Sequence, residues 1–206
     1  MSNNILSSLF NQLSWKLTII KEKIQGIDLT KTVSQEELNL NPAIHEKYAN
    51  SGNKHLCFVL KNLQITKEDQ IVDYGSGKGG ALLTMAKFPF KKIEGIEISE
   101  ELHKIACKNI KRLNKNNVFS SNSDALNFNQ LDDFNYFYFY NPFNEVLFLP
   151  VLKKINNTLF SKPRATTLIY NNPVCHNMIV KETPFKLIAK YPSFYNFKIF
   201  VYKNNN

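Results

Sequence analysis

A glycine-rich turn between two short apolar segments constrains the fold of this chain more than any other feature. Ile71 and Val72 form a short apolar strand that ends in Asp73, and four glycines follow within residues 75–80. A helix is expected after this turn, and a second apolar strand ends in Glu97. A strand, a turn, a helix and a second strand in this order predict a βαβ unit, and therefore a parallel sheet covered by helices.

The turn is suited to an adenosine cofactor. Gly75 and Gly77 allow the backbone to turn sharply and to approach a ligand without a Cβ in the way. The helix expected to begin near Gly79 directs unpaired N–H groups toward the same crevice, next to Ser76. Glu97 follows Gly77 by twenty residues, which is the spacing at which a carboxylate accepts hydrogen bonds from ribose hydroxyls.

Two cofactors and a purely structural turn have to be distinguished. Gly75, Gly77 and Gly80 also satisfy the pattern G-x-G-x-x-G of nicotinamide dinucleotide (NAD) sites. Asp73, however, would face the diphosphate of NAD at short range, which is unfavourable. The same carboxylate suits the ammonium group of S-adenosylmethionine (SAM), which has a ribose and no phosphate. The sequence therefore favours SAM over NAD and over a turn needed only for packing.

Several motifs around this turn also resemble a group of bacterial proteins. The segments that carry the resemblance are Asp73-Tyr-Gly-Ser-Gly-Lys-Gly79, Phe88-Pro-Phe90, Gly95-Ile-Glu97-Ile-Ser99, Glu101-Leu-His103, Ile105-Ala106, Asn141-Pro-Phe143 and Asn172-Pro-Val174. Over about residues 26–202 the chain is similar to class I SAM-dependent methyltransferases of a largely uncharacterised bacterial group. That group usually has arginine where this chain has Gly80, so any role of that arginine is absent here.

The resemblance implies a Rossmann-like α/β fold with a mostly parallel seven-stranded sheet and an antiparallel last strand. Alternating segments are consistent with this fold. Strands are expected near 70–74, 92–97, 118–120, 135–140 and 165–170, helices near 54–62, 79–88, 100–114 and 144–159, and an antiparallel pair at 185–191 and 196–202. We expect an N-terminal helical extension over residues 1–66 and a SAM-binding methyltransferase domain over residues 67–206.

Length and composition limit the class of protein. A chain of 206 residues with 43% hydrophobic residues can form one domain with a substantial core. It has no apolar run long enough for a spanning helix, and the N-terminus lacks the pattern of a signal peptide. Three widely spaced cysteines indicate reduced thiols and argue against a disulfide framework or a metal site. These features predict a cytoplasmic enzyme without a metal.

The net charge of +9 raises the question of an anionic partner. Nearly all the positive charge is lysine, and Arg112 and Arg164 are the only arginines, whereas bidentate recognition of bases and phosphates favours arginine. The lysines are also spread along the chain. A nucleic-acid partner is therefore disfavoured.

The N-terminal segment has an amphipathic pattern. Apolar residues recur with helical spacing over residues 5–25, opposite a polar face. Such a helix can pack on the domain as a lid or brace. Weak peripheral contact with a membrane through Trp15 and neighbouring lysines, and an oligomer contact, are the alternatives. The resemblance further places an acidic residue near Asp28 and a tyrosine near Tyr48 ahead of the core, where they either line the pocket or, for Asp28, form a turn.

Asp124 follows the third expected strand. In methyltransferases an acidic residue at the end of this strand accepts a hydrogen bond from the adenine amino group, and the resemblance assigns this role to Asp124, with Asn122 as second choice. The alternative is that Asp124 caps a turn or a helix.

The fourth expected strand ends in Asn141, Pro142 and Phe143. Ligands of open α/β sheets bind beyond the carboxyl ends of the strands, so this end is expected to face the transferred methyl group. The three residues resemble the Asn/Asp-Pro-Pro-Tyr motif of N-methyltransferases, with one proline fewer and Phe in place of Tyr. The alternative is that the proline only ends the strand.

Proton removal from an acceptor would need a base only if the acceptor arrives protonated. Tyr140, His176 and His45 are the candidates. Cys175 beside His176 lacks a plausible third partner, so a cysteine nucleophile is disfavoured.

These observations predict a SAM-dependent methyltransferase whose acceptor is unidentified, with a protein or small-molecule amine ranked first. The similarity of the Asn-bearing loop to that of Rossmann-type lysine methyltransferases keeps a protein acceptor in view. Methylation of a sugar or surface-polymer precursor, and a non-catalytic SAM-binding protein, are the alternatives. An NAD-dependent oxidoreductase is disfavoured because Asp73 would face the diphosphate and because the chain lacks a second domain.

Overall fold

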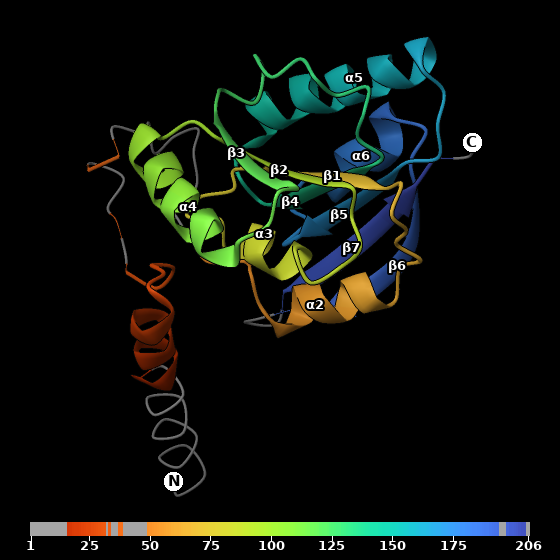
Figure 1. The fold of residues 1–206 in the computed structure, drawn as a ribbon. Helices are drawn as coiled ribbons and strands as arrows, with labels where there is room; N and C mark the ends of the chain where they lie inside the picture. The colour runs from red at the N-terminus through yellow and green to blue at the C-terminus, as the bar shows by residue number, and fades with distance from the viewer. Residues whose placement is uncertain (1–15, 32, 34–36, 39–48, 194–196, 205–206) are drawn as a thin grey trace, which may run out of the picture.

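The computed structural model describes residues 16–31, 33, 37–38, 49–193 and 197–204. It contains a seven-stranded sheet with helices on both faces (Figure 1). The strands are β1 (Gln70–Tyr74), β2 (Lys92–Glu97), β3 (Val118–Asn122), β4 (Tyr136–Tyr140), β5 (Thr167–Asn171), β6 (Lys186–Pro192) and β7 (Lys198–Lys203). The helices are α2 (Lys54–Lys61), α3 (Gly80–Met85), α4 (Glu100–Leu113), α5 (Glu145–Ser161) and α6 (His176–Glu182), and residues 16–25 are also helical.

The strand order is β3-β2-β1-β4-β5-β7-β6, and β7 runs antiparallel to both of its neighbours. The other pairs, from β3 to β5, are parallel. The strands β2, β1 and β4 are neighbours and parallel, so their carboxyl ends lie side by side at the same end of the sheet. The fold class expected from the sequence is confirmed, including the reversed last strand.

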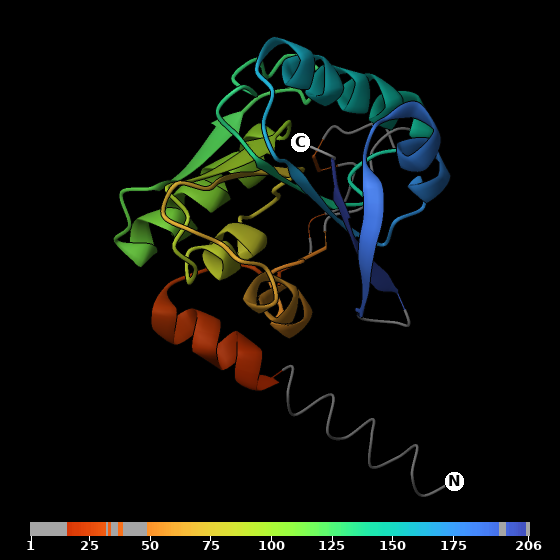
Figure 2. The same cartoon turned by 90° about the vertical axis from the view of Figure 1, so that its right-hand side faces the viewer.

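Two apolar cores lie on the two faces of the sheet. Residues of α2, α3 and α4 pack against strand residues in one core, and residues of α5 and α6 do so in the other. Figure 2 shows the same two layers from the side. The side chains of β4, which read Tyr-Phe-Tyr-Phe-Tyr, alternate between these cores, so the central strands are buried on both faces as expected for a parallel sheet.

The helix boundaries differ from expectation for local reasons. The helix α3 begins at Gly80 because Gly79 has the left-handed φ of +83°, and its C-cap is Ala86, shortly before the Phe88-Pro pair. The helix α5 begins after Asn144, whose side chain accepts a hydrogen bond from the main chain of Leu147. The short helix α6 is not among the expected helices, and only Ile179 among its residues is buried, so it has little apolar periodicity.

The N-terminal helical segment, residues 16–25, lies outside the layer formed by α2, α3 and α4 (Figures 1 and 2). Leu17, Ile20 and Ile24 are exposed on it, while Glu22 is buried and accepts hydrogen bonds from the main chain of Leu29 and Thr30. Residues 5–15 of the predicted helix lie outside the described residues. The predicted roles of this segment, as a brace, as an oligomer contact or as a weak membrane contact, stay predictions.

Further findings concern cysteines, metals and membranes. Cys57, Cys107 and Cys175 are free thiols. Within the described ranges, no group of His, Cys, Asp and Glu residues is arranged to hold a metal ion. No helix in that part of the chain is long and apolar enough to cross a bilayer.

Candidate active site

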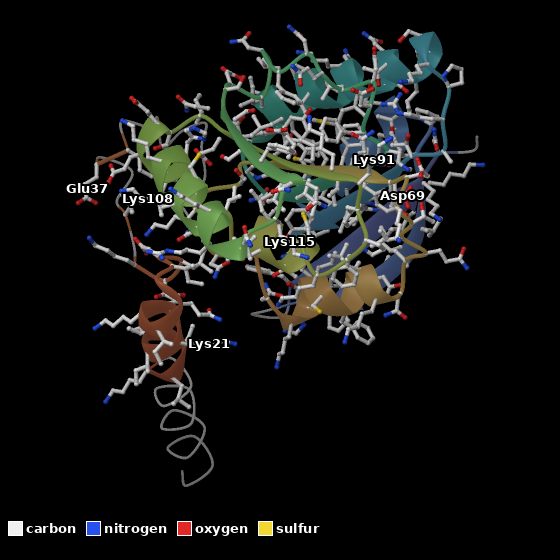
Figure 3. All side chains as sticks on the ribbon, in the orientation of Figure 1. Lys21, Glu37, Asp69, Lys91, Lys108 and Lys115 are labelled. Carbon is white, nitrogen blue, oxygen red and sulfur yellow. The ribbon has the colours of Figure 1, made fainter. Side chains whose placement is uncertain are left out.

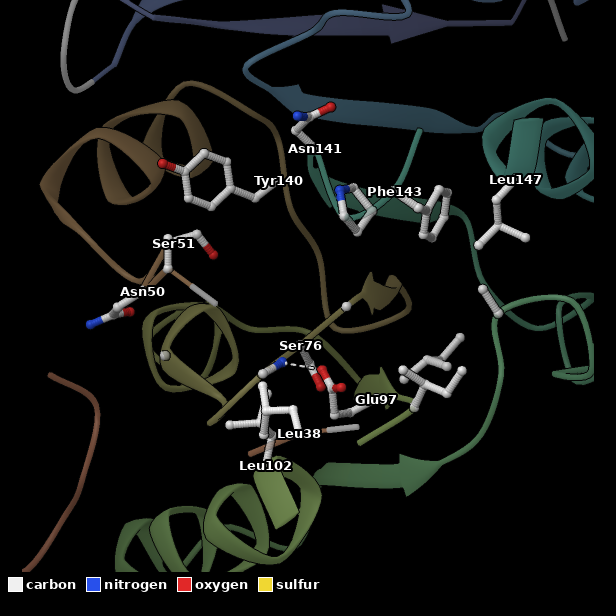
Figure 4. A pocket seen from close by; sticks show the side chains of 18 of the residues that line it. Leu38, Asn50, Ser51, Ser76, Glu97, Leu102, Tyr140, Asn141, Phe143 and Leu147 are labelled. Carbon is white, nitrogen blue, oxygen red and sulfur yellow. Dashed lines mark hydrogen bonds between the residues drawn. The ribbon is translucent and has the colours of Figure 1, made fainter. Parts of the chain in front are cut away.

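A cavity of about 300 Å³ opens at the carboxyl ends of β1, β2 and β4. Its wall includes the glycine turn after β1, the end of β2, the loop after β3 and the loop after β4. In Figure 4 the side chains of Asn141 and Phe143 lie across the cavity from those of Ser76 and Glu97. The cavity therefore has one side built from the glycine turn and β2 and an opposite side built from the end of β4.

The glycine turn is held to β2 by main-chain hydrogen bonds. The N–H groups of Gly75 and Ser76 both donate to the carbonyl oxygen of Ile96, at 3.0 Å each. Gly75 has a φ of +75°, and a Cβ added there would lie 2.7 Å from Cβ of Pro142. Glycine is therefore required at position 75 both by its left-handed backbone and by the close approach of the β4 loop.

Glu97 organises the same turn. One carboxylate oxygen accepts a hydrogen bond from the N–H of Gly77 at 2.7 Å, and the other accepts one from the N–H of Ser99 at 2.9 Å. Burial raises the pKa of Glu97, while hydrogen bonds from the main chain lower it in part. Each carboxylate oxygen can accept a second donor, so Glu97 could hold ribose hydroxyls without releasing the turn.

Asp73 lies in β1, next to Tyr138 of β4 in the sheet, and is 2% exposed. Burial, and to a smaller extent the charge of Glu97, raise the pKa of Asp73 well above its ordinary value. Asp73 and Gly79 do not belong to the cavity wall, whereas the predicted residues Gly75, Ser76, Gly77, Glu97 and Asp124 do. A role of Asp73 in cofactor binding stays a prediction.

Ser76 offers a test of whether a cofactor fits. Its hydroxyl is buried and has no hydrogen-bond partner within the described part of the chain. The hydroxyl packs against β2, where a Cβ added to Gly95 would lie 2.6 Å from it. A buried hydroxyl without a partner is costly, and Ser76 also belongs to the cavity wall, so a polar ligand at this wall could supply the missing bond. The residues present thus fit a polar cofactor such as SAM.

Asp124 and Asn122, the two candidates for a hydrogen bond to the adenine of the cofactor, differ in their contacts. Asp124 lines the cavity with Ser123 and Ala125, and its carboxylate also accepts a hydrogen bond from the N–H of Leu126 at 2.7 Å. Asp124 therefore caps a turn and faces the cavity at the same time. Asn122 donates through its side chain to the carbonyl oxygens of Glu97 and Ile98 and does not belong to the wall.

The end of β4 brings the four predicted catalytic residues to the cavity: Tyr140, Asn141, Pro142 and Phe143 all line it. Asn141 has a left-handed φ of +40°, which asparagine tolerates better than most residues. The hydroxyl of Tyr170, on the adjacent strand β5, lies 3.4 Å from the side-chain oxygen of Asn141 and donates to it. The amide of Asn141 is thus oriented by a buried neighbour.

Of the candidate bases, some line the cavity and others do not. Tyr140 lines the cavity. His176 does not, and its Nδ1 lies 2.9 Å from the hydroxyl of Tyr202. Cys175 is buried, and its thiol pKa is raised by that burial, which argues further against a cysteine nucleophile. His45 and Tyr48 lie outside the described residues.

Sequence reasoning missed part of the wall. Asn50 and Ser51, from the segment before α2, line the cavity, and so do Leu38, Asn172 and Phe197. Asn172 follows β5 and has a φ of +53°, so the ends of two adjacent parallel strands carry left-handed asparagines in the cavity wall. The two Asn-Pro pairs, at 141–142 and 172–173, are the sequence feature that could have indicated these similar positions of Asn141 and Asn172. For Asn50 and Ser51 the sequence contained no comparable signal.

Asp28 was expected either to line the pocket or to form a turn, and its contacts differ from both expectations. It does not line the cavity. Its carboxylate instead forms an ion pair with Lys78 of the glycine turn at 2.8 Å.

Solved structures with a similar fold include methyltransferases. Ribosomal protein L11 methylase from Lactobacillus delbrueckii subsp. bulgaricus has 13% identity and a TM-score of 0.58, over 81% of this chain and 84% of that one. A SAM-dependent methyltransferase from Aquifex aeolicus has 15% identity and a TM-score of 0.56, over 72% and 88% of the two chains. An RNA methyltransferase from Salinibacter ruber, in complex with S-adenosylhomocysteine (SAH), has 16% identity and a TM-score of 0.51, over 73% and 91%. A search of curated protein sequences found no significant match.

The sequence model of one protein family matches a long part of the chain. That family is described as "Histone methylation protein DOT1", and the match covers residues 31–168, from the segment before α2 to β5. It therefore includes the glycine turn, Glu97, Asp124 and the loop after β4. With this match and the class I methyltransferase fold, the chain belongs to the DOT1 family and is a SAM-dependent methyltransferase.

Proposed function

We propose that this methyltransferase transfers the methyl group of SAM to an amine carried by a protein. The observation that carries the proposal is the position of Asn141, Pro142 and Phe143 in the cavity wall, across from the glycine turn and Glu97. A cofactor held by the turn and Glu97 would leave the β4 side of the cavity for the acceptor. The side-chain oxygen of Asn141, which accepts a hydrogen bond from the hydroxyl of Tyr170, belongs to this side and has a second lone pair.

The residues of the chain would divide the task between two sides of the cavity. Gly75, Gly77 and Glu97 would hold the cofactor, with Asp124 at its adenine end. When bound, SAM supplies an activated methyl group whose transfer leaves a neutral thioether. Asn141 would accept hydrogens of the acceptor amine through its side-chain oxygen and so fix the direction of the nitrogen lone pair. Most of the rate enhancement would then come from alignment of the reactants.

The aromatic side chains complete the acceptor side. Phe143 is buried against Phe148 of α5, with ring centroids 6.0 Å apart, and therefore has a fixed position in the wall. Tyr140 is partly buried and is the candidate that could accept a proton from an incoming ammonium group directly or through water. Together they would exclude bulk water from the reacting nitrogen.

A protein acceptor is supported by the family rather than by the cavity. The family description names histone methylation, that is, methylation of a protein, and the family match includes every residue assigned above. This supports a protein amine over a free small molecule.

The test is methyl transfer from radiolabelled SAM to lysine-containing polypeptides, both acidic and basic, with free N-acetyl-lysine amide as the small amine. We expect label in the polypeptide, recovered as methyl-lysine after hydrolysis. Label in the free amine alone would contradict a protein acceptor, and label recovered as a methyl ester or methyl ether would contradict an amine.

Asn141→Ala should reduce turnover by about tenfold to a hundredfold, because the amine loses the group that orients it, while the Kd for SAH should stay within about twofold. Asn157→Ala, at an exposed position of α5, is the matched control and should retain wild-type turnover. Normal turnover in Asn141→Ala would overturn its assigned role.

A further inference from the structure

A fully buried lysine lies inside the glycine turn. Lys78 stands between Gly77 and Gly79, and its side chain is 0% exposed. Lys78 does not belong to the cavity wall. Its ammonium group donates to the carboxylate of Asp28 at 2.8 Å and to the carbonyl oxygen of Lys31 at 2.7 Å. A buried ammonium is tolerated only where such partners replace water. The turn is thus bound to the N-terminal segment, 50 residues away in sequence.

Asn109 joins the same two segments. It lies in α4 and is 1% exposed. Its side-chain oxygen accepts a hydrogen bond from the N–H of Asp28 at 2.9 Å, and its side-chain nitrogen donates to the carbonyl oxygens of Asp28 at 2.8 Å and of Lys78 at 2.9 Å. One amide therefore satisfies both main-chain groups of Asp28 and the carbonyl of Lys78. This is a built junction and not a chance surface contact.

The chain contacts the turn again just before α2. A Cβ added to Gly52 would overlap the carbonyl group of Gly80, and one added to Gly80 would overlap the side-chain oxygen of Asn50. The side chain of Asn50 in turn accepts a hydrogen bond from the N–H of Gly52 at 2.9 Å. Positions 78 and 80 of the turn are therefore held by two parts of the N-terminal region, residues 28–31 and 50–52.

We propose that Lys78 and Asn109 are positioning residues for the cofactor. By fastening residues 28–31 to the glycine turn, they hold the main chain of Gly77 and Gly79, with φ values of +54° and +83°, in the conformation that receives SAM. The affinity for SAM then depends on Asp28, which lies outside the cavity. The proposal rests on the assignment of the glycine turn to the cofactor.

The junction between Asp28 and Lys78 and the binding of the cofactor should influence each other. If the junction between Asp28 and Lys78 favours cofactor binding, the cofactor must stabilise that junction by the same free energy. Opening of residues 26–31 should therefore become rarer when the cofactor is bound.

The experiment compares Asp28→Asn, Lys78→Met and the double variant by calorimetric titration with SAH and by thermal unfolding of the ligand-free proteins. We expect the Kd for SAH to rise at least about fivefold in each single variant, a typical size for coupling between two sites. Asp28→Asn should also lower the unfolding temperature, because it replaces the carboxylate paired with the buried ammonium of Lys78 by a neutral amide. The double variant removes that charge, so it should regain the unfolding temperature and still bind SAH weakly.

Glu100→Gln is the matched control, since it breaks an ion pair with Lys104 that lies on the exposed surface of the same helix as Asn109. This variant should change neither the Kd for SAH nor the unfolding temperature. A lower unfolding temperature with an unchanged Kd would show that the junction is structural only, and the proposal would be overturned. If the wild-type protein bound neither SAM nor SAH, the cofactor site itself would be wrong.

A second measurement needs no variant. Hydrogen exchange of the wild-type protein should slow in the peptide that contains residues 26–31 when SAH is added. Unchanged exchange in this peptide, together with slower exchange in the turn, would overturn the link between the two while leaving the cofactor site intact.

Discussion

At the scale of single residues, two neighbouring buried carboxyl groups have raised pKa values, Glu97 in the cavity wall and Asp73 next to it in the sheet. Asp73 and Glu97 lie on adjacent strands, and they are 2% and 5% exposed. The charge of Glu97 adds to the effect of burial on the pKa of Asp73. Two carboxylates in this position destabilise each other in the free protein, whereas a bound cation would compensate both.

Asp73→Asn should affect the free energy of unfolding and the binding of the cofactor in opposite directions. Because its pKa is raised in the folded state, Asp73 lowers the free energy of unfolding as pH rises from its ordinary pKa through the raised one. The asparagine variant has no such group, so its unfolding free energy should increase relative to that of the wild type as pH rises from the ordinary pKa of aspartate toward the raised one. Urea denaturation across this pH range measures the difference. Glu101→Gln, which removes an exposed carboxylate, is the control and should show no such change.

The same variant should lose the pH dependence of cofactor binding. In the wild-type protein, affinity for the cationic cofactor should increase as pH rises through the raised pKa of Asp73, since only the carboxylate attracts a cation. In Asp73→Asn, cofactor binding should be nearly constant with pH, and it should be weaker than in the wild type above the raised pKa of Asp73. A Kd profile equal to that of the wild type would remove Asp73 from the site.

Glu97 has two functions that different substitutions can separate. Glu97→Ala should weaken SAM binding by about 1–3 kcal/mol through lost hydrogen bonds, and it also removes the acceptor for the N–H of Gly77. Glu97→Gln keeps one acceptor oxygen for the turn and loses the charge, so it should bind SAM more tightly than the alanine variant. Equal, wild-type affinity in both variants would mean that the ribose is held elsewhere.

At the scale of elements, the glycine turn is packed so closely that neighbouring segments fix the residue type. In the group that the chain resembles, an arginine usually stands at position 80, where this chain has glycine. The structure gives the reason, because the side-chain oxygen of Asn50 occupies the place where a Cβ at position 80 would project. Asn50, from the segment before α2, thus lies beside Gly80 in the cavity wall.

Gly52→Ala should destabilise the protein more than Gly80→Ala. A Cβ at position 52 overlaps main-chain atoms of Gly80, which cannot rotate away, so we expect a loss of about 1–3 kcal/mol or more. A Cβ at position 80 meets the end of the Asn50 side chain, which can rotate at the cost of one hydrogen bond, about 1 kcal/mol. Urea denaturation of the two variants gives the comparison.

The control for this pair is Gly80→Ala combined with Asn50→Ala, which removes the contact at position 80. Its unfolding free energy should be no lower than that of Gly80→Ala alone. A Gly80→Ala variant as unstable as Gly52→Ala would show that Asn50 cannot move.

At the scale of the whole molecule, the positive charge is distributed over the surface. Lys21, Lys91, Lys108 and Lys115 are exposed and lie on different segments (Figure 3). With a net charge of +9, the long-range field favours the approach of an acidic protein and opposes that of a basic one.

The ionic strength should therefore affect acceptors differently. For an acidic protein acceptor, kcat/KM should fall severalfold when the salt concentration rises from about 0.05 to about 0.3 M, because the field is screened; for a basic acceptor it should rise. A small uncharged amine is the control and should change little. The same salt dependence for acidic and basic acceptors would show that the net charge does not influence encounter.

Local sequence determined the order of the elements and the cofactor side of the site. The strands β1, β2, β4 and β5 were predictable because buried parallel strands are short apolar runs. Gly75, Gly77 and Glu97 were predictable as members of the cavity wall because the turn and the carboxylate are separated by a recognisable spacing. The boundary between residues 66 and 67 stays a prediction.

The tertiary structure alone decided which distant segments complete the site. No local pattern indicates that Lys78 is buried or that it pairs with Asp28, and Asn50 carries no motif. These contacts join residues far apart in the chain, so they depend on how the N-terminal region packs against α3 and α4 and not on local periodicity. The physical reason is that periodicity reports which face of an element is apolar, whereas the partner of a buried charge is set by the packing of whole segments.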